Sequence, residues 1–486
     1  MNILGNRNHW ILKKHTNSIS KLIDVALYLK STKSSISNED KEKMYDEFSK
    51  SLMYNPRIST REKPLDALNH RISELNYYMF GYSDKIDGEQ KFIFSPLGNM
   101  FLKNLSDYDK IQKIFATMLF SIQFPHPASS PSEDFYLYPF RLIFKLLLDE
   151  RLGGKLYNFE MYRFIIYIDN ISEEIYESLV SEILLSRKLS DEHKFEYLKN
   201  REKIIVKSTY EWQYYVSKLL EDVRIIERNT GDKVVDLYHP QKPNSKSKPT
   251  KRKINNGYFK LNSKLKEYIE KLMEEYSFLE KPLVLNDSER GSSDVVKEIY
   301  SFYPDILLEE LGEEINQIQT KMLRLPKLID KYSNNPNNET SDLFEDILEE
   351  AFNMFINVEA KKLSGAGRTD IECLYLTIPQ KFAVEAKSTS NKLMGINAGR
   401  LKRHRKIIGA KYTIVVTPRY VPSVQYDIEE QNIVIIKANT LSEYFYNNII
   451  SNNRNMDYGE IHEIVANNLG TDVSLKVSEL TLTKFG

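Results

Sequence analysis

The segment SGAGRTDIECLYLTIPQKFAVEAKS, residues 364–388, contains the pattern that decides the fold of the C-terminal part of the chain. TDIECLYL alternates apolar and polar residues and KFAVEAK is a short apolar run, so the segment predicts two neighbouring strands of a hairpin. Glu385 and Lys387 lie two positions apart on the second strand and therefore share one face. Asp370 opens the first strand, and a hairpin of this length brings it beside the end of the second. The pattern thus groups two carboxylates and one ammonium group on one face of a sheet.

Predicted helices and strands on either side of this hairpin complete a mixed sheet. An amphipathic helix is expected at 342–356, before the hairpin, with a candidate strand at 357–364. A basic helix at 397–408 follows the hairpin, and the apolar strands KYTIVVT and NIVIIKA come after it. This order predicts a C-terminal α/β domain in which helices pack on a central mixed sheet.

The three grouped side chains suit a particular chemistry. Carboxylates are the hard oxygen ligands that Mg²⁺ requires, and bound Mg²⁺ lowers the pKa of a water molecule and neutralises charge on a phosphate oxygen. A lysine two residues after a metal-binding carboxylate can orient that water or stabilise developing charge. The alternative is a surface strand with an aspartate and a Glu–Lys pair, because an aspartate followed by Glu-x-Lys also occurs by chance.

Composition limits the class of protein. The chain has 486 residues, 41% of them hydrophobic, and at about 150 residues per domain this predicts roughly three globular domains. A net charge of +0 excludes a wholly basic nucleic-acid coat protein but allows a local basic face. The single cysteine, Cys373, excludes an intrachain disulfide and a multi-cysteine zinc site. We find no apolar run long enough to span a membrane and no secretory signal, so the cytoplasm is the expected location.

The N-terminal half is predicted to be mainly helical, and in two places a short strand leads into a helix. In KFIFSPLG, residues 91–98, the aromatic residues alternate as in a strand, while Ser95 and Pro96 suit the N-cap and first position of a helix. NNGYFKLNSKLKEYIEKL, residues 255–272, repeats this arrangement. Such junctions suggest winged-helix-like modules, and two unrelated strand–helix junctions in a helical domain are the alternative.

Two polar segments are predicted as linkers. HPQKPNSKSKPTKRK, residues 239–253, is basic, has three prolines and lacks large apolar residues, and SNNPNNETS covers 333–341. The expected organisation is therefore a helical, winged-helix-like region at 1–238, a second winged-helix-like or helical connector at 254–332 and the α/β domain at 342–486.

Residues 364–388 resemble the core of the PD-(D/E)xK nucleases, with Thr369-Asp370 in the place of "PD" and Glu385-Ala386-Lys387 in the place of "(D/E)xK". Threonine stands where many members have proline, which is not obligatory. The preceding helix with Phe344-Glu345, and the glycine-rich turn before Asp370, further resemble a FokI-type cleavage domain. The detailed resemblance covers roughly residues 340–420. The N-terminal half is similar in architecture to the DNA-binding part of AlwI- and FokI-type type IIS restriction endonucleases.

The resemblance implies a role for each matching residue. Asp370 and Glu385 would hold a catalytic Mg²⁺, which Mn²⁺ may replace, and Lys387 would be the positioning lysine. Glu345 matches a glutamate that contributes to the metal site in several members, and Glu349, one turn later, is the alternative. An exposed helix glutamate without a catalytic role is the other interpretation of Glu345.

The basic helix after the second hairpin strand is a candidate DNA-binding element. Arg400, Arg403 and His404 belong to a run of six basic-type residues within seven positions. Because the run directly follows the candidate catalytic strand, we expect contacts with DNA phosphates, which position the backbone but do not read its sequence. A solvated charged face is the alternative.

The resemblance implies a Mg²⁺-dependent type II site-specific deoxyribonuclease of type IIS. The N-terminal half would bind a short asymmetric sequence of double-stranded DNA, and the C-terminal domain would cut at a fixed distance. One active site cuts one strand, so a double-strand break requires a transient homodimer or sequential nicking. A strand-specific nicking enzyme or a modification-dependent defence nuclease of the same fold is the first alternative. A non-catalytic winged-helix DNA-binding protein is the second.

Overall fold

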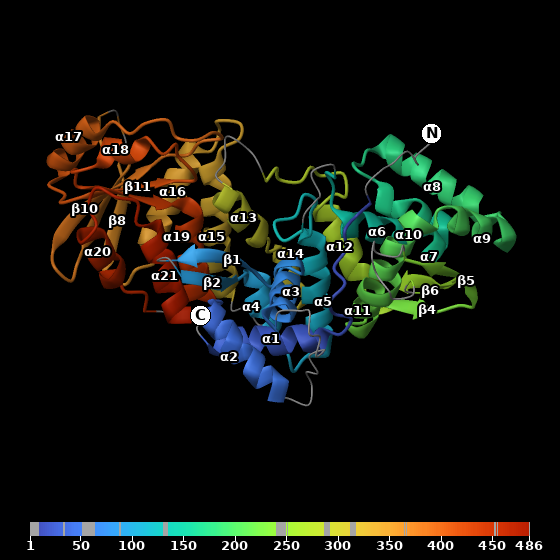
Figure 1. Cartoon of the computed structure of the whole chain (residues 1–486). Coiled ribbons are helices and arrows are strands. Elements are labelled where there is room, and N and C mark those ends of the chain that lie inside the picture. The colour runs from blue at the N-terminus through green and yellow to red at the C-terminus, as the bar shows by residue number, and fades with distance from the viewer. Residues whose placement is uncertain are drawn as a thin grey trace. The chain divides into compact units, whose positions relative to one another are not determined.

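The computed structural model describes residues 9–32, 35–50, 64–86, 89–129, 135–239, 249, 251–285, 292–311, 317–363, 365, 367–451, 453 and 455–485 (Figure 1). The chain forms two compact units. Unit 1 comprises residues 1–84, 90–285 and 299–313, and unit 2 comprises residues 85–89, 286–298 and 314–486. Among the described helices, none is both long and apolar enough to cross a membrane.

Unit 1 is mainly helical, as predicted, and carries short strands. Its helices are α1 (Ile19–Ser31), α2 (Asn38–Lys50), α3 (Pro64–Tyr77), α4 (Pro96–Lys103), α5 (Tyr108–Ser121), α6 (Pro139–Leu148), α7 (Asn158–Arg163), α8 (Glu173–Arg187), α9 (Asp191–Asn200), α10 (Glu202–Glu211), α11 (Ser217–Asp222), α12 (Lys266–Glu275) and α14 (Asp305–Glu310). Its strands are β1 (Gly81–Ile86) and β2 (Glu89–Phe94), whose connecting residues count with unit 2, then β3 (Lys155–Tyr157), β4 (Ile226–Asn229), β5 (Lys233–Tyr238), β6 (Lys251–Asn255) and β7 (Tyr258–Leu261).

The first predicted strand–helix junction is confirmed. Ser95 caps α4, because its hydroxyl accepts a 2.9 Å hydrogen bond from the backbone N–H of Gly98 and donates a 2.6 Å bond to the carbonyl of Met79. Pro96 takes the first helical position. A Cβ at Gly98 would lie 2.0 Å from the carbonyl oxygen of Phe80, so the close approach of α4 to the chain before β1 requires glycine there.

The second junction also forms, but it is not a separate module. β7 leads toward α12 as predicted, yet it is the central strand of a three-stranded sheet with the order β3-β7-β4. Unit 1 continues through residue 285 without a division at 254. The chain therefore differs from the predicted connector at 254–332, because residues 286–298 and 314–332 of that segment belong to unit 2.

The basic segment 239–253 differs in part from the predicted linker. Lys251, Arg252 and Lys253 belong to β6, which pairs antiparallel with β5 over Tyr238↔Lys251, Leu237↔Arg252 and Asp236↔Lys253. The prediction for residues 240–248 and 250 lies outside the described residues. Part of the predicted linker is therefore a strand of unit 1. Its polar residues can form a strand because their backbone groups pair with β5.

Unit 2 contains the predicted mixed sheet with helices packed on it. Its strands are β8 (Val358–Lys362), β9 (Ile371–Tyr375), β10 (Gln380–Ala386), β11 (Thr413–Thr417) and β12 (Ile433–Lys437), in the order β12-β11-β10-β9-β8. Its helices are α15 (Gln317–Asn334), α16 (Ser341–Phe352), α17 (Ala398–Ile408), α18 (Val424–Ile428), α19 (Ala438–Ile450), α20 (Gly459–Ala466) and α21 (Ser474–Phe485), while α13 (Ser292–Tyr300) is divided between the units.

The register of the sheet confirms the hairpin and makes β10 its central strand. β10 pairs antiparallel with β9 and parallel with β11, and β11 pairs parallel with β12. On one face, Leu401 of α17 and Val424 of α18 form a buried cluster with Val415 of β11, and Figure 1 shows α17 beside α18. On the other face, Phe382 of β10 contacts Phe352 of α16. Since β11 is buried along its whole length, helices cover both faces.

The turn at 333–341 joins two packed helices within unit 2, which differs from the predicted linker between domains. The side chain of Asn335 is buried and accepts a 2.9 Å hydrogen bond from the backbone N–H of Thr340. Its amide nitrogen donates a 3.0 Å bond to the hydroxyl of Ser388, directly after β10. The polar composition that suggested a linker therefore satisfies the backbone of an ordered turn.

Candidate active site

The structure brings Asp370, Glu385 and Lys387 together at the carboxyl end of β10. Ile371 pairs with Val384, so Asp370, one residue before, lies across from Glu385. The ammonium nitrogen of Lys387 lies 2.6 Å from Oε1 of Glu385 and 4.0 Å from Oδ2 of Asp370. Thr369 holds the start of β9, because its hydroxyl donates a 3.2 Å bond to the carbonyl of Val384. The hairpin therefore produces the cluster that its sequence pattern predicted.

Glu385 is a buried carboxylate with one oxygen satisfied and the other not. Its side chain is 1% exposed, and Oε1 accepts hydrogen bonds from Lys387 Nζ at 2.6 Å and from Arg400 Nη2 at 2.9 Å. Oε2 is buried and has no hydrogen-bond partner among the described residues. A buried carboxylate oxygen without a donor is costly, and a cation is one group that would satisfy it.

Asp370 is held in an environment that disfavours its charge. Burial and the neighbouring charge of Glu385 raise the pKa of Asp370 to about 7, against the opposing effects of Lys387 and of the backbone N–H of Ala386. That N–H donates a 2.8 Å bond to Oδ2. The charge of Glu385 thus opposes the ionisation of Asp370, and a divalent cation bound by Asp370 would remove this penalty.

The residues present fit a Mg²⁺ ion that retains water ligands. Within the described part of the chain, no group of three or more His, Cys, Asp or Glu side chains is arranged to hold a metal. Mg²⁺ is commonly bound through only one or two carboxylates while it keeps several waters, so Asp370 and Oε2 of Glu385 form a sufficient donor set.

Glu345 and Glu349 have different surroundings on α16. Glu349 Oε1 accepts a 3.0 Å hydrogen bond from the backbone N–H of Lys362 and so links α16 to the end of β8. Glu345 lies 3.4 Å from the ammonium nitrogen of Lys362 and is close enough to Asp370 to raise its pKa. Of the two alternatives, Glu345 is the one in electrostatic contact with the site, and its carboxylate is paired with a lysine.

The basic helix α17 divides into a buried face and an exposed face. Asn397 caps it by accepting a 2.9 Å bond from the N–H of Arg400, whose guanidinium then reaches Glu385. Arg403 is exposed, as a phosphate contact requires. His404, which we also predicted as a DNA contact, is only 7% exposed, and burial lowers its pKa. The pattern of charges alone did not reveal which side chains the sheet covers.

Arg419, which the sequence did not single out, fixes the chain that follows β10. It is buried, and its Nη2 donates 3.2 and 2.8 Å bonds to the carbonyls of Thr389 and Ser390. Its Nη1 donates a 2.6 Å bond to the side chain of Asn334 at the end of α15. A lone arginine after a strand carries no recognisable signal, so only the tertiary contacts identify this role.

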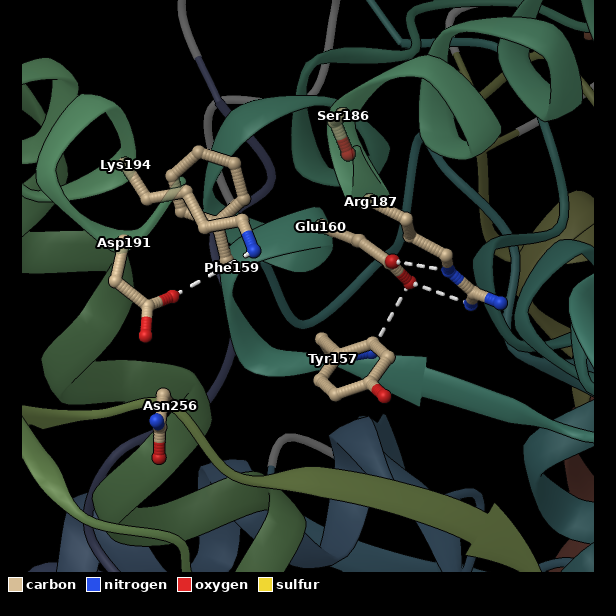
Figure 2. A pocket seen from close by; sticks show the side chains of 8 residues that line it. All are labelled: Tyr157, Phe159, Glu160, Ser186, Arg187, Asp191, Lys194 and Asn256. Carbon is tan, nitrogen blue, oxygen red and sulfur yellow. Dashed lines mark hydrogen bonds and ion pairs between the residues drawn. The ribbon is translucent and has the colours of Figure 1, made fainter. Parts of the chain in front are cut away.

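A cavity of about 180 Å³ in unit 1 is not part of this cluster (Figure 2). Its charged lining is paired within itself: Glu160 bonds both Arg187 Nε at 2.7 Å and the N–H of Tyr157 at 3.0 Å, and Lys194 lies 3.7 Å from Asp191. The charged groups of this lining therefore have structural partners.

Comparisons with known proteins place this two-unit chain among the type II restriction endonucleases. The family model described as "Type II restriction endonuclease HgaI, N-terminal domain" matches residues 5–276. Over 484 residues, which are 100% of this chain and 99% of the relative, it is 60% identical to the type II restriction enzyme HgaI of Avibacterium volantium. The chain belongs to the HgaI family of type II restriction endonucleases.

Solved structures with lower similarity include restriction endonuclease FokI, at 10% identity and a TM-score of 0.26, with coverage of 96% of this chain and 99% of FokI. The binding domain of the BpuJ1 endonuclease, in complex with pyrene- and phenanthrene-modified DNA, aligns with 61% of this chain and 94% of its own length at 16% identity and a TM-score of 0.37. The family assignment rests on the sequence matches.

Proposed function

We propose that this chain is a type IIS restriction endonuclease that hydrolyses DNA with Mg²⁺ held by Asp370 and Glu385. The observation that carries the proposal is the buried Oε2 of Glu385, which has no partner among the described residues and belongs to a carboxylate lying across from Asp370. Unit 2 would then be a PD-(D/E)xK nuclease core. Unit 1, which contains most of the matched family model, would read a short asymmetric sequence through winged-helix-like elements, with cleavage at a fixed distance from it.

The chain's own residues would divide the work of hydrolysis. When bound, Mg²⁺ would supply a water molecule of lowered pKa and a positive charge for a phosphate oxygen, and Mn²⁺ would replace it. Lys387 would hold the Glu385 carboxylate and stabilise negative charge that develops on the phosphate, since its ammonium group lies within 4.0 Å of both carboxylates. The negative charge of Glu345 would help to raise the pKa of Asp370.

The proposed partner is double-stranded DNA, and a double-strand break would need two copies of unit 2. Each chain carries one cluster of Asp370, Glu385 and Lys387, and one such site acts on one strand. We therefore propose a transient homodimer, with sequential nicking as the alternative. The expected cytoplasmic location is part of the same proposal, because this is where the enzyme would meet DNA.

Substitution of the catalytic cluster tests this function. Asp370→Ala and Lys387→Ala should each lower cleavage of plasmid DNA by more than a thousandfold, while a gel-shift assay in EDTA shows retardation equal to that of the parent. Run-off sequencing of parent products would reveal whether both strands are cut and at which offset. Residual cleavage by Asp370→Ala within tenfold of the parent would rule out the metal-ligand role.

A further inference from the structure

Arg400 extends from α17 to the catalytic glutamate. The cap by Asn397 starts the helix, and the buried Leu401 and His404 seat it on the sheet, so Arg400 is directed toward β10. Its Nη2 donates a 2.9 Å hydrogen bond to Oε1 of Glu385. This contact was not expected, because the sequence pattern predicted Arg400 as a phosphate contact.

The contact determines which oxygen of Glu385 is available to a cation. Lys387 and Arg400 both bond Oε1, whereas Oε2 is buried without a donor among the described residues. With two donors on one oxygen, the carboxylate cannot rotate without losing two charge-assisted bonds. The arrangement therefore leaves Oε2 available to the metal ion that Glu385 and Asp370 would both bind.

The Arg400 side chain remains partly exposed to solvent. The group has five N–H donors, and its side chain is 45% exposed although one nitrogen bonds Glu385. The planar guanidinium can hold a carboxylate on one edge and a phosphate on another. We propose that Arg400 is a positioning residue that orients Glu385 for the metal and links metal binding to the binding of a DNA phosphate. The inference rests on the proposed metal role of Asp370 and Glu385.

Such a link has a thermodynamic consequence that activity alone does not report. If one side chain serves both ligands, metal binding should raise the affinity for DNA, and DNA should raise the affinity for metal by the same factor. Loss of a group that orients a metal ligand usually weakens metal binding by about 10- to 100-fold. Arg403, an exposed arginine on the same helix, provides the matched control.

The first measurement is Mn²⁺ binding to the full chain without DNA, followed by the electron paramagnetic resonance signal of free Mn²⁺. Arg400→Ala should weaken binding about tenfold, whereas Arg403→Ala should bind like the parent. Asp370→Ala should lose the site. Alanine favours helix, so both arginine variants should fold, and circular dichroism would verify this.

The second measurement is DNA affinity in Ca²⁺ and in EDTA at one salt concentration, with Ca²⁺ as a cation that should allow binding without hydrolysis. In the parent, Ca²⁺ should tighten DNA binding at least tenfold. Arg400→Ala should bring this ratio close to one, while Arg403→Ala should weaken both affinities equally and keep the ratio.

The outcomes separate the inference from the function on which it rests. Unchanged or tighter Mn²⁺ binding by Arg400→Ala would overturn the positioning role, and an unchanged Ca²⁺ ratio would overturn the link to DNA. If the parent binds no Mn²⁺, or Asp370→Ala binds it equally well, the proposed metal site itself fails and the inference fails with it.

Discussion

Asp370 is placed where folding works against its charge. Burial raises the pKa of Asp370 to about 7, and Glu385 adds to the shift. In an unfolded chain the same aspartate ionises near 3.8. The metal-free protein therefore stores unfavourable energy at this residue, which is a common feature of functional sites.

The first prediction concerns the stability of Asp370→Asn in EDTA. A raised carboxyl pKa in the folded state means that stability falls as the pH rises from about 4 to about 7 and then levels off, since only the unfolded chain loses its proton readily in that window. The amide that replaces the carboxyl group has no proton to lose in this range. The variant should therefore match the parent at pH 4 and exceed its stability at pH 8 by on the order of 2 kcal/mol.

Urea unfolding at pH 4, 6 and 8 measures this difference. Glu372→Gln serves as control, because Glu372 lies two residues after Asp370 but is paired with Lys381. If Asp370→Asn is no more stable than the parent at pH 8, the burial of an ionised Asp370 is contradicted. The same holds if its gain in stability is equal at all three pH values.

At the scale of one element, α17 carries charge for two purposes. Arg400 and the buried His404 and Arg405 face the sheet, whereas Lys402 and Arg403 are exposed. The second prediction is that Lys402→Ala with Arg403→Ala makes the log–log salt dependence of DNA binding shallower by about two units, because each phosphate contact contributes roughly 0.9. The effect should be the same for cognate and unrelated DNA.

Fluorescence anisotropy between 50 and 200 mM salt would give the slope. Arg405→Lys is a suitable comparison, since Arg405 is buried against the carbonyl of Asn432 and should not contribute to the slope. An unchanged slope in the double variant would make the exposed side of α17 a solvated face only.

The turn between α15 and α16 is hydrogen-bonded to Ser388, directly after β10, and so supports the end of that strand. Asn335 and Asn338 both have left-handed backbone conformations, with φ of 37° and 57°, but only Asn335 is buried and bonded to Ser388 and Thr340. The third prediction is that Asn335→Ala destabilises the protein by about 1–3 kcal/mol more than Asn338→Ala, because it leaves buried polar groups without a hydrogen-bond partner. Cleavage should also fall, since Ser388 adjoins Lys387.

Urea unfolding measures the stability of both variants. Because both positions have a left-handed backbone, the difference between the variants reports the hydrogen bonds of Asn335 alone. Equal midpoints for Asn335→Ala and Asn338→Ala would mean that the turn does not brace β10.

For the whole molecule, the limit of unit 2 decides which fragment can fold. α15 belongs to this unit and packs on α19: the hydroxyl of Ser442 bonds both the carbonyl of Pro326 and the carboxyl of Asp330 at 2.9 Å. The fourth prediction is that a fragment of residues 314–486 folds, binds Mn²⁺ and cuts DNA without sequence preference. A fragment of 334–486, which begins within the predicted linker, should not fold, because it exposes the face of α19 that α15 covers.

Thermal melts followed by circular dichroism distinguish the two fragments. A cooperative transition only for 314–486 is expected. Equal cooperative melting of both would show that α15 is dispensable, and specific cleavage by 314–486 would place sequence recognition in unit 2.

Short-range patterns in the sequence were sufficient for the hairpin and for its three central residues. The alternation in TDIECLYL and KFAVEAK fixed which side chains share a face, and the structure confirms the pairing of β9 with β10. Ser95 and Pro96 likewise indicated the start of α4. These features depend on neighbours a few residues apart, so local periodicity and capping chemistry determine them.

Only the tertiary structure decided the roles that depend on distant parts of the chain. The contact of Arg400 with Glu385, the burial of His404 and the bonds from Arg419 to Thr389 and Ser390 join segments that no local pattern relates. The same holds for the two segments predicted as linkers, where strand pairing and the bonds of Asn335 give polar residues a structural use. Polar composition alone does not predict a linker, because a polar side chain can be exposed to water or satisfy a buried group, and only packing decides between the two.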